Sequence, residues 1–394
     1  MSTPLGSTLL ACLFWSSMAL LAYIYAGYPL LIALLARWKK RGTQPHSLSA
    51  NESDSRSITV LLAAHHEPAT LPRKICNLLE SSSARHITQI LVGLDGADEE
   101  TQRSLASLNI PVLRVIPFPD RRGKPSVLND LARHATGEIL LFVDARQTFE
   151  PDTIAKLLRR FDDPAVAVVS GELKFTTPEE ATTASEGVGF YWKYEKFIRK
   201  QESAFRGVPG ATGACYALRR SAFEPIPGET ILDDVLIPMQ AVMQGGRCVF
   251  EADATAWDVP AKTTCHESTR KRRTIAGNVQ LILLKPALIL PWKNPLWFEF
   301  VSHKLLRLAS PWLLVVAVLT NLALATTQPI YAWILGLQLA AWLLALAGAV
   351  AQTWGRQLRY CAPFLMFATL NWTTLLAEWD ALWNRYQVTW KRVG

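Results

Sequence analysis

Long apolar stretches mark both ends of the chain, and a polar middle separates them. From Met1 to Ala36 there is no charged residue, and residues 9–35 form an apolar run. A helix of this length can cross a hydrocarbon core of about 30 Å. Two further apolar runs, 308–326 and 330–351, are joined by a short connection that contains Pro329. The pattern predicts an N-terminal membrane helix and a C-terminal helical hairpin.

Basic residues beside the first run set the expected orientation. Arg37, Lys39, Lys40 and Arg41 follow it directly, and cytoplasmic flanks of membrane helices are enriched in Lys and Arg. The run is too long for a cleaved signal peptide and has no basic residues before it. We therefore expect an integral protein of the bacterial inner membrane, with its polar middle region in the cytoplasm.

The middle of the chain alternates between short apolar runs and helical patterns, which predicts an α/β domain with a mainly parallel sheet. The expected strands are 58–63, 89–94, 112–116, 138–143 and 166–170, and the expected helices are 68–80, 99–108, 124–134 and 151–161. The chain is accordingly divided into an anchor (1–41), a polar linker (42–57), a cytoplasmic domain (58–285), an interfacial segment (286–307), a membrane hairpin (308–351) and a membrane-associated C-terminal segment (352–394).

Acidic residues follow three of the predicted strands. Glu67, Asp95 and Asp144 each stand just beyond a strand end, and Lys124 lies between the last two in sequence. The carboxyl ends of parallel strands share one edge of a sheet, where ligands bind. A single Asp in such a place is often a turn residue or a helix cap. Three acids with a lysine predict a site for phosphate, metal or sugar.

The amino-acid composition limits the kinds of molecule that the protein is expected to bind. Hydrophobic residues make up 50% of the 394 residues, charged residues make up 19%, and the chain holds 14 tryptophans. On such a protein the formal charge of +8 suits contact with anionic membrane lipids. No basic stripe interleaved with aromatic residues indicates nucleic-acid binding, and no GxGxxG or Walker lysine motif is present. The six cysteines form no CxxC pair and are expected to be reduced.

The order of motifs from residue 58 to residue 273 resembles that of the inverting family 2 glycosyltransferases. These membrane-bound enzymes have a GT-A-type fold and include synthases of cellulose, hyaluronan and poly-N-acetylglucosamine. The matching motifs are Ala64-His65-His66-Glu67, Leu94-Asp95-Gly96-Ala97-Asp98, Gly123-Lys124-Pro125, Thr212-Gly213-Ala214 and Leu232-Asp233-Asp234. The resemblance implies that a GT-A-type domain is carried between membrane helices at both ends.

The resemblance also implies a role for each motif. Glu67 and Asp95 would hold the nucleoside of a nucleotide-sugar donor, and Lys124 would lie near its phosphates. Thr212, Gly213 and Ala214 would form a loop on the acceptor side. Asp234 would be the catalytic base, which takes the proton of the attacking hydroxyl. Asp233 beside it would raise the proton affinity of Asp234 by like-charge repulsion.

Two motifs depart from the family pattern. The metal-binding DxD is here Asp144-Ala145-Arg146. Asp144 could hold Mg²⁺ or Mn²⁺ together with the donor diphosphate, and Arg146 could instead neutralise part of the diphosphate charge. The family's QxxRW-like element is reduced to Arg270 and Arg273, with Thr274 in place of tryptophan. The two arginines could still stabilise the leaving diphosphate, and the less favoured alternative is that their cluster faces anionic lipid headgroups.

The expected function is transfer of a sugar, with inversion, from a UDP-sugar to a lipid or glycan acceptor. Such a reaction would belong to the synthesis of an envelope or extracellular polysaccharide or of a glycolipid. The alternative is a non-catalytic component that binds nucleotide sugars in a polysaccharide assembly or export complex. The altered DxD favours the alternative, whereas the Asp233-Asp234 pair favours an enzyme. A transporter is disfavoured, because the expected spans contain no charged residues of a pathway.

Overall fold

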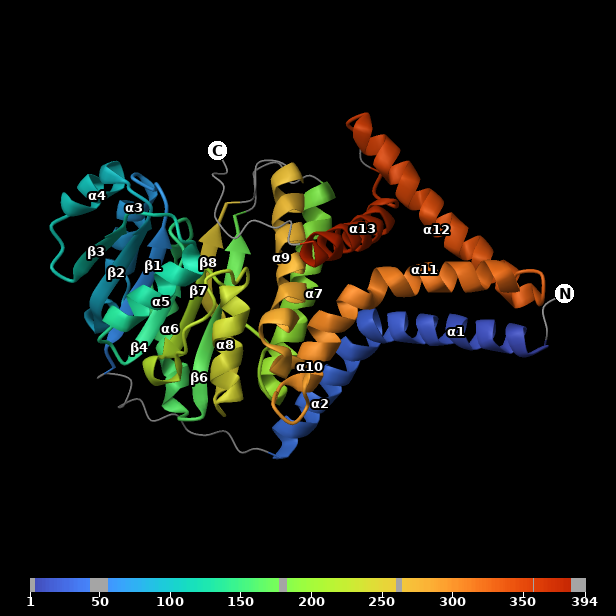
Figure 1. Ribbon diagram of the computed structural model, residues 1–394, viewed down its shortest axis with the longest axis horizontal. Coiled ribbons are helices and arrows are strands. Elements are labelled where there is room, and N and C mark those ends of the chain that lie inside the picture. Colours follow the sequence, from blue (N-terminus) through green and yellow to red (C-terminus); the bar gives the residue numbers. More distant parts are fainter. Residues whose placement is uncertain (1–3, 43–55, 177–182, 260–263, 357, 384–394) are drawn as a thin grey trace.

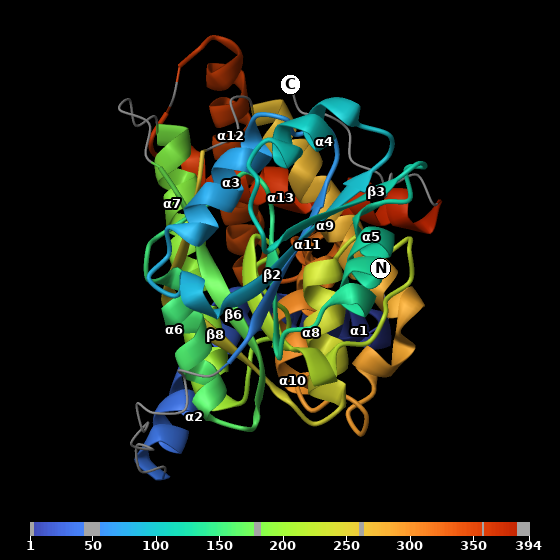
Figure 2. The ribbon, with the colours of Figure 1, turned by 90° about the vertical axis from the view of Figure 1, so that its left-hand side faces the viewer.

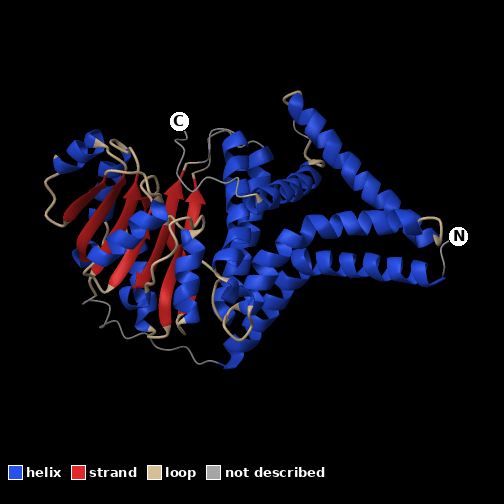
Figure 3. Ribbon diagram, in the orientation of Figure 1, coloured by secondary structure: helices blue, strands red, loops and turns tan. Residues whose placement is uncertain are grey.

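The protein is built around one sheet of eight strands. The computed structural model describes residues 4–42, 56–176, 183–259, 264–356 and 358–383. Within them the strands follow the spatial order β3-β2-β1-β4-β7-β6-β8-β5, and Figure 3 shows them as a single layer. Their bounds are β1 (Ile58–Ala64), β2 (Ile87–Asp95), β3 (Leu113–Phe118), β4 (Ile139–Val143), β5 (Thr148–Phe149), β6 (Val166–Phe175), β7 (Cys215–Arg219) and β8 (Arg247–Asp258).

The sheet is mainly parallel, as predicted. Strands β1 to β4 run parallel to one another, and β6 runs parallel to β8. Strand β7 is antiparallel to both of its neighbours, β4 and β6, and the short β5 is antiparallel to β8. The sequence patterns identified β1, β2, β3, β4 and β6 but not β5, β7 and β8. The fold class is therefore confirmed, with two antiparallel strands inside a mainly parallel sheet.

Helices cover both faces of the sheet, which explains the continuous apolar strands. Val60 and Leu62 of β1 belong to one core, and Leu61 and Ala63 belong to the other. Figure 2 shows α3 and α6 on one side of the sheet and α5 and α8 on the other. The helices of the domain are α3 (Thr70–Leu79), α4 (Glu99–Ala106), α5 (Lys124–His134), α6 (Thr153–Arg159), α7 (Thr183–Phe205), α8 (Asp233–Met243) and α9 (Thr264–Leu284).

Long apolar helices extend away from the sheet. Helix α1 (Pro4–Ala22) continues through the π-helical turn η1 (Tyr23–Gly27) into α2 (Tyr28–Gly42). It lies beside α11, as Figure 1 shows. Among the described residues, three stretches are long and apolar enough to cross a membrane: Leu5–Lys39, Trp297–Leu324 and Pro329–Thr353. The C-terminal helices are α10 (Trp297–Phe300), the π-helical η6 (Val301–Leu305), α11 (Leu306–Leu324), α12 (Pro329–Thr353) and α13 (Ala362–Leu382).

The helix boundaries only partly follow the expected segments. Helices α10, η6 and α11 follow one another without a break, so the expected boundary between 307 and 308 falls inside one helix. Helix α13 packs mainly against α9 and α12. Most of the linker 42–57 lies outside the described residues. The division into segments and the cytoplasmic orientation therefore remain predictions.

A buried polar network joins the membrane-type helices to the domain. His303 lies between two glutamates of α7, with Nδ1 2.8 Å from Glu202 Oε1 and Nε2 2.9 Å from Glu195 Oε2. The Tyr28 hydroxyl donates to the same Glu202 oxygen over 2.6 Å. Buried hydrogen bonds of this kind favour one arrangement of the elements that carry them. Helix α7 is thereby held against the helices that leave the domain.

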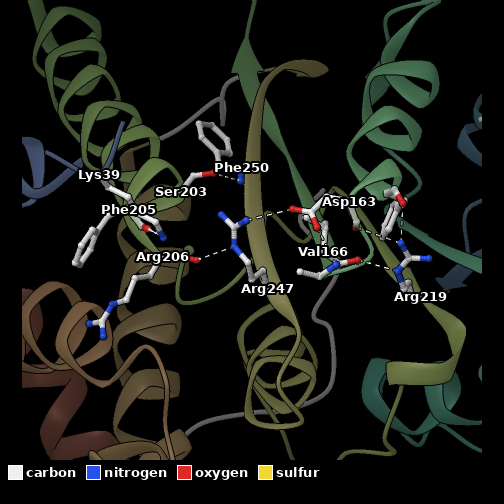
Figure 4. Close-up of polar contacts among 11 residues, drawn as sticks. Lys39, Asp163, Val166, Ser203, Phe205, Arg206, Arg219, Arg247 and Phe250 are labelled. Atoms are coloured by element: carbon white, nitrogen blue, oxygen red, sulfur yellow. Dashed lines mark hydrogen bonds and ion pairs between the residues drawn. The ribbon is translucent and has the colours of Figure 1, made fainter. Parts of the chain in front are cut away.

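A second set of polar contacts fixes the lower end of the sheet. Arg247, at the start of β8, reaches Asp163 Oδ2 over 3.3 Å. The Nε of Arg219, at the end of β7, donates to the carbonyl of Val166 over 2.8 Å. Figure 4 shows these contacts across the three neighbouring strands β6, β7 and β8. They lie at the opposite end from the carboxyl ends of β1, β2 and β4, where the predicted site residues gather.

Candidate active site

Asp95 builds the loop that leads into α5. It is the last residue of β2 and is buried. Its two carboxylate oxygens accept hydrogen bonds from the backbone N–H groups of Arg122 (2.7 Å) and Gly123 (3.0 Å). Gly123 has a φ of 85°, a left-handed conformation that glycine adopts without steric cost. Asp95 therefore positions the first residue of α5, which is Lys124.

The end of β1 is tied to the end of β2. His65 Nδ1 lies 2.6 Å from the carbonyl oxygen of Asp95, and the N–H of Glu67 donates to Thr101 Oγ1 over 3.1 Å. Glu67 itself is partly buried at this rim. The two residues predicted to hold the nucleoside, Glu67 and Asp95, are thus brought to neighbouring strand ends. Their contact with a nucleoside remains a prediction.

Lys124 joins the two halves of the predicted site. Its Nζ lies 2.9 Å from Asp144 Oδ1, beyond β4, and 3.3 Å from Asp233 Oδ2, at the start of α8. Its side chain is only 15% exposed. Burial alone would lower the pKa of Lys124, but the carboxylates of Asp144, Asp233 and Asp234 outweigh it and raise the pKa. The ammonium is therefore permanently charged and holds these acids together.

Asp234 has the properties of a proton acceptor. Burial and, next, the charge of Asp233 raise its pKa to about 6, although Lys124 acts in the opposite direction. The predicted effect of Asp233 thus has the right sign, while burial is the larger cause. A group with a pKa of about 6 is mostly ionised at neutral pH, yet it is more basic than an ordinary aspartate. Such tuning is characteristic of general bases.

The Thr212-Gly213-Ala214 loop packs directly against Asp234. The N–H of Ala211 donates to the backbone carbonyl of Asp234 over 2.7 Å. A Cβ atom on Gly213 would lie 3.0 Å from Asp234 Oδ2, so a larger residue here would push the Asp234 carboxylate aside. Ala214 is buried where β7 begins. The structure therefore brings the expected acceptor loop and the expected base together.

Arg199 of α7 was not predicted by the sequence analysis. Its Nη1 donates to Thr212 Oγ1 over 2.8 Å, and its Nη2 donates to Ser170 Oγ over 2.7 Å. Ser170 Oγ in turn accepts from the N–H of Thr212 over 2.9 Å. The Arg199 guanidinium thus binds both Thr212 and Ser170 of β6, the two residues that join this loop to the sheet. The sequence offered one signal for Arg199. It belongs to a charged stripe on the helix, because Glu195, Arg199 and Glu202 are spaced four and three residues apart.

The two arginines predicted to stabilise the leaving group lie on α9. The Arg270 guanidinium lies 5.8 Å from the centre of the Phe175 ring. The Nε of Arg273 is buried and has no hydrogen-bond partner among the described residues. One helical turn later, a Cβ on Gly277 would lie 2.6 Å from Leu232. Helix α9 therefore packs closely against the residue before Asp233, and a role for its arginines with the leaving group remains a prediction.

Arg146 takes part in an ion pair at the rim. Its Nη2 lies 2.7 Å from Asp258 Oδ2, and Gln147 Nε2 donates to the same oxygen over 2.9 Å. Asp144, two residues earlier, is paired with Lys124. Across the part of the chain that the structure describes, no group of three His, Cys, Asp or Glu side chains could hold a metal ion. The expected cation site therefore offers one carboxylate, Asp144, which is already ion-paired.

Comparison with known sequences identifies the central part of the chain. Residues 59–226 match the family described as Glycosyl transferase family 2. An N-acetylglucosaminyltransferase of Sinorhizobium fredii is 24% identical over 278 residues, which cover 68% of this chain and 66% of that relative. One from Rhizobium leguminosarum is 24% identical over 169 residues, which cover 42% of this chain and 40% of that relative. The chain thus spans slightly under two thirds of the first relative and two fifths of the second.

The fold is similar to that of a solved enzyme structure. The mannosyltransferase PcManGT from Pyrobaculum calidifontis, in complex with GDP-Man and Mn²⁺, matches with a TM-score of 0.67 and 22% identity. The match covers 95% of this chain and 100% of that one. At this identity the likeness establishes the architecture alone. Residues 59–226 therefore match the glycosyltransferase family 2 description, and the fold is of the GT-A type.

Proposed function

We propose that this protein is a membrane-bound glycosyltransferase that transfers a sugar from a UDP-sugar to a lipid or glycan hydroxyl with inversion. The observation that carries the proposal is Asp234. Its carboxylate has a raised pKa, lies against the acceptor loop at Gly213 and follows directly on Asp233, which is paired with Lys124. A non-catalytic sugar-nucleotide binder has no use for a base tuned in this way.

The proposed reaction is a single displacement. The acceptor oxygen attacks the anomeric carbon while Asp234 takes the hydroxyl proton. The bond from that carbon to the diphosphate oxygen breaks with both electrons, and UDP leaves. Attack opposite to the leaving group inverts the anomeric configuration. Positioning of the two substrates and stabilisation of charge on the diphosphate account for most of the expected rate.

The donor would lie along the rim from β1 to α8. Glu67 and Asp95 would face the nucleoside, while Lys124 and Asp144 would lie near the diphosphate and the sugar. Arg270 and Arg273 would stabilise the departing UDP. UDP-N-acetylglucosamine is the first donor to test, because both bacterial relatives are named N-acetylglucosaminyltransferases.

A divalent cation does not fit the described residues well. Hard cations such as Mg²⁺ and Mn²⁺ prefer several oxygen ligands, and the rim carboxylates Asp144 and Asp233 are both paired with Lys124. Two positions further along the chain stands the cationic Arg146. When bound in an enzyme of this fold, such a cation neutralises diphosphate charge. The proposed steps here therefore use only the side chains of the chain itself.

The membrane helices suggest an acceptor that reaches the membrane surface. Helix α7, which carries Arg199, is joined by Glu202 to His303 and Tyr28 of the apolar stretches. The acceptor loop is therefore a short distance along one helix from the membrane. A lipid-linked or growing glycan acceptor, used in the synthesis of an envelope polysaccharide or glycolipid, suits this placement. A cytoplasmic site in an inner membrane is the matching location.

Replacing the base tests the proposal first. In purified full-length protein with UDP-sugars and membrane lipid extract, Asp234→Asn should lower sugar transfer by about 100-fold or more, because general bases contribute this much. Binding of UDP should stay within a few-fold of wild type. Asp152→Asn, at an exposed ion pair on α6, is the matched control and should keep full activity. Binding of UDP-sugar without transfer, in wild type and variants alike, would favour the non-catalytic alternative.

The pH profile tests the tuning of Asp234. Its pKa of about 6 means that the base becomes protonated as the pH falls through this value. We expect kcat/KM to fall about tenfold per pH unit below this point, as for a single essential base. Asp233→Asn removes a charge that raises the pKa of Asp234, so the acid limb should move to lower pH. An unchanged acid limb in this variant would show that another group controls it.

Arg199 should act by positioning the acceptor loop. Arg199→Met removes the donors to Thr212 and Ser170 while keeping an apolar stem of similar length. We expect kcat to drop by about 10- to 100-fold, as misplaced reacting groups cause, with UDP affinity unchanged. Lys200→Met, at the next and exposed position of α7, is the control and should behave as wild type. Equal loss of UDP binding and turnover would indicate a general folding defect instead.

A further inference from the structure

The loop after β4 holds a guanidinium at the donor rim. Arg146 lies two residues after Asp144 in the segment that crosses from β4 to β5. Its side chain is 59% exposed, whereas the side chain of its partner Asp258 is fully buried. One edge of the guanidinium is thus anchored in the fold. The rest of the side chain is largely exposed, so a ligand at the rim can reach it.

The position of Arg146 is fixed by its neighbours. Gln147 Nε2 donates to Asp258 Oδ2 over 2.9 Å. The buried Lys74 donates from Nζ to the carbonyl of Gln147 over 2.9 Å. Strand β5, which follows at once, is paired with β8 beside Asp258. The loop is therefore pre-organised, and no large rearrangement is needed for Arg146 to receive an anion.

The rim carries more negative than positive charge, so an anionic ligand needs additional positive charge there. Asp144 and Asp233 share the single ammonium of Lys124, and Lys124 is only 15% exposed. An entering nucleoside diphosphate adds further negative charge. A guanidinium binds phosphate oxygens through two parallel N–H donors and is always charged. Arg146 has the right chemistry and a fixed place for this task.

The same loop disfavours a divalent cation. Asp258, the other carboxylate near the loop, is occupied by Arg146 and Gln147. Asp144 is occupied by Lys124. A cation held by Asp144 would lie close to the ammonium of Lys124, which opposes it by Coulomb repulsion. The two arrangements, a cation or an arginine, are therefore alternatives at this position.

We propose that Arg146, together with Lys124, takes the place of a divalent cation, so that the donor binds as a metal-free nucleoside diphosphate sugar. The inference rests on the proposed function and deepens it, since it names the ionic form of the donor and the residue that receives it. Arg146 would contact the diphosphate while Asp258 keeps it in place. Lys124 would supply charge from the opposite side, next to Asp144.

Calorimetry of UDP and GDP binding to the full-length protein in detergent tests this. It would be run in excess EDTA and in excess Mn²⁺. Wild type should bind one nucleotide with the same affinity in both buffers, within about twofold. Arg146→Gln should weaken binding about tenfold in EDTA, the effect of losing one charge-assisted contact. Arg160→Gln, which breaks an ion pair with Glu251 at an exposed arginine, is the matched control and should bind as wild type.

A double variant controls for misfolding of the single variant. Arg146→Gln leaves Asp258 buried without its cation, so Arg146→Gln combined with Asp258→Asn removes both charges together. The pair variant should melt near the wild-type temperature and still bind UDP weakly in EDTA. Wild-type binding that needs Mn²⁺, or unchanged affinity in the folded pair variant, would overturn the inference while leaving the transferase proposal intact. Failure of wild type to bind any nucleotide in either buffer would overturn both.

Discussion

The contact on which the site depends is the buried ammonium of Lys124 between Asp144 and Asp233. It joins the carboxyl end of a central strand to the first turn of α8, two elements that are far apart in the sequence. Without this cation, Asp144, Asp233 and Asp234 would repel one another in a partly buried place. Asp95 fixes the loop before Lys124 through two backbone N–H groups. The positive charge of Lys124 therefore fixes the strand ends, the start of α8 and Asp234 relative to one another.

The packing of the domain holds this rim, and helix α7 links the Thr212–Ala214 loop to the apolar helices. Helices on both faces bury the central strands β1 and β4, which holds the rim. Helix α7 carries a charged stripe with two tasks. Arg199 contacts the Thr212–Ala214 loop at Thr212, and Glu195 and Glu202 contact His303. The position of the apolar helices and the geometry of this loop are thus connected through one helix.

Much of this arrangement could be predicted from sequence, because the central parallel strands are apolar on both faces and end in acids. Strand β8 was missed because Ala252, Ala254 and Ala256 alternate with polar residues, and alanine is a weak strand former. Strand β7 is antiparallel to both of its neighbours, so it falls outside the strand–helix alternation that predicted the parallel strands. The partners of Arg199 and Arg146 lie up to 112 positions away, so no local pattern could reveal them. The pKa of Asp234 depends on burial, which only the packed structure defines.

The anomeric configuration of the product tests the central claim most directly. Full-length protein would be incubated with an α-linked UDP-sugar and an acceptor that supports turnover, and the new linkage would be read from its ¹H NMR coupling constant. Direct attack assisted by Asp234 predicts a β-linked product, formed with one inversion. An α-linked product would contradict the account, because it requires either two displacements or a front-side mechanism that makes no use of a base at this position.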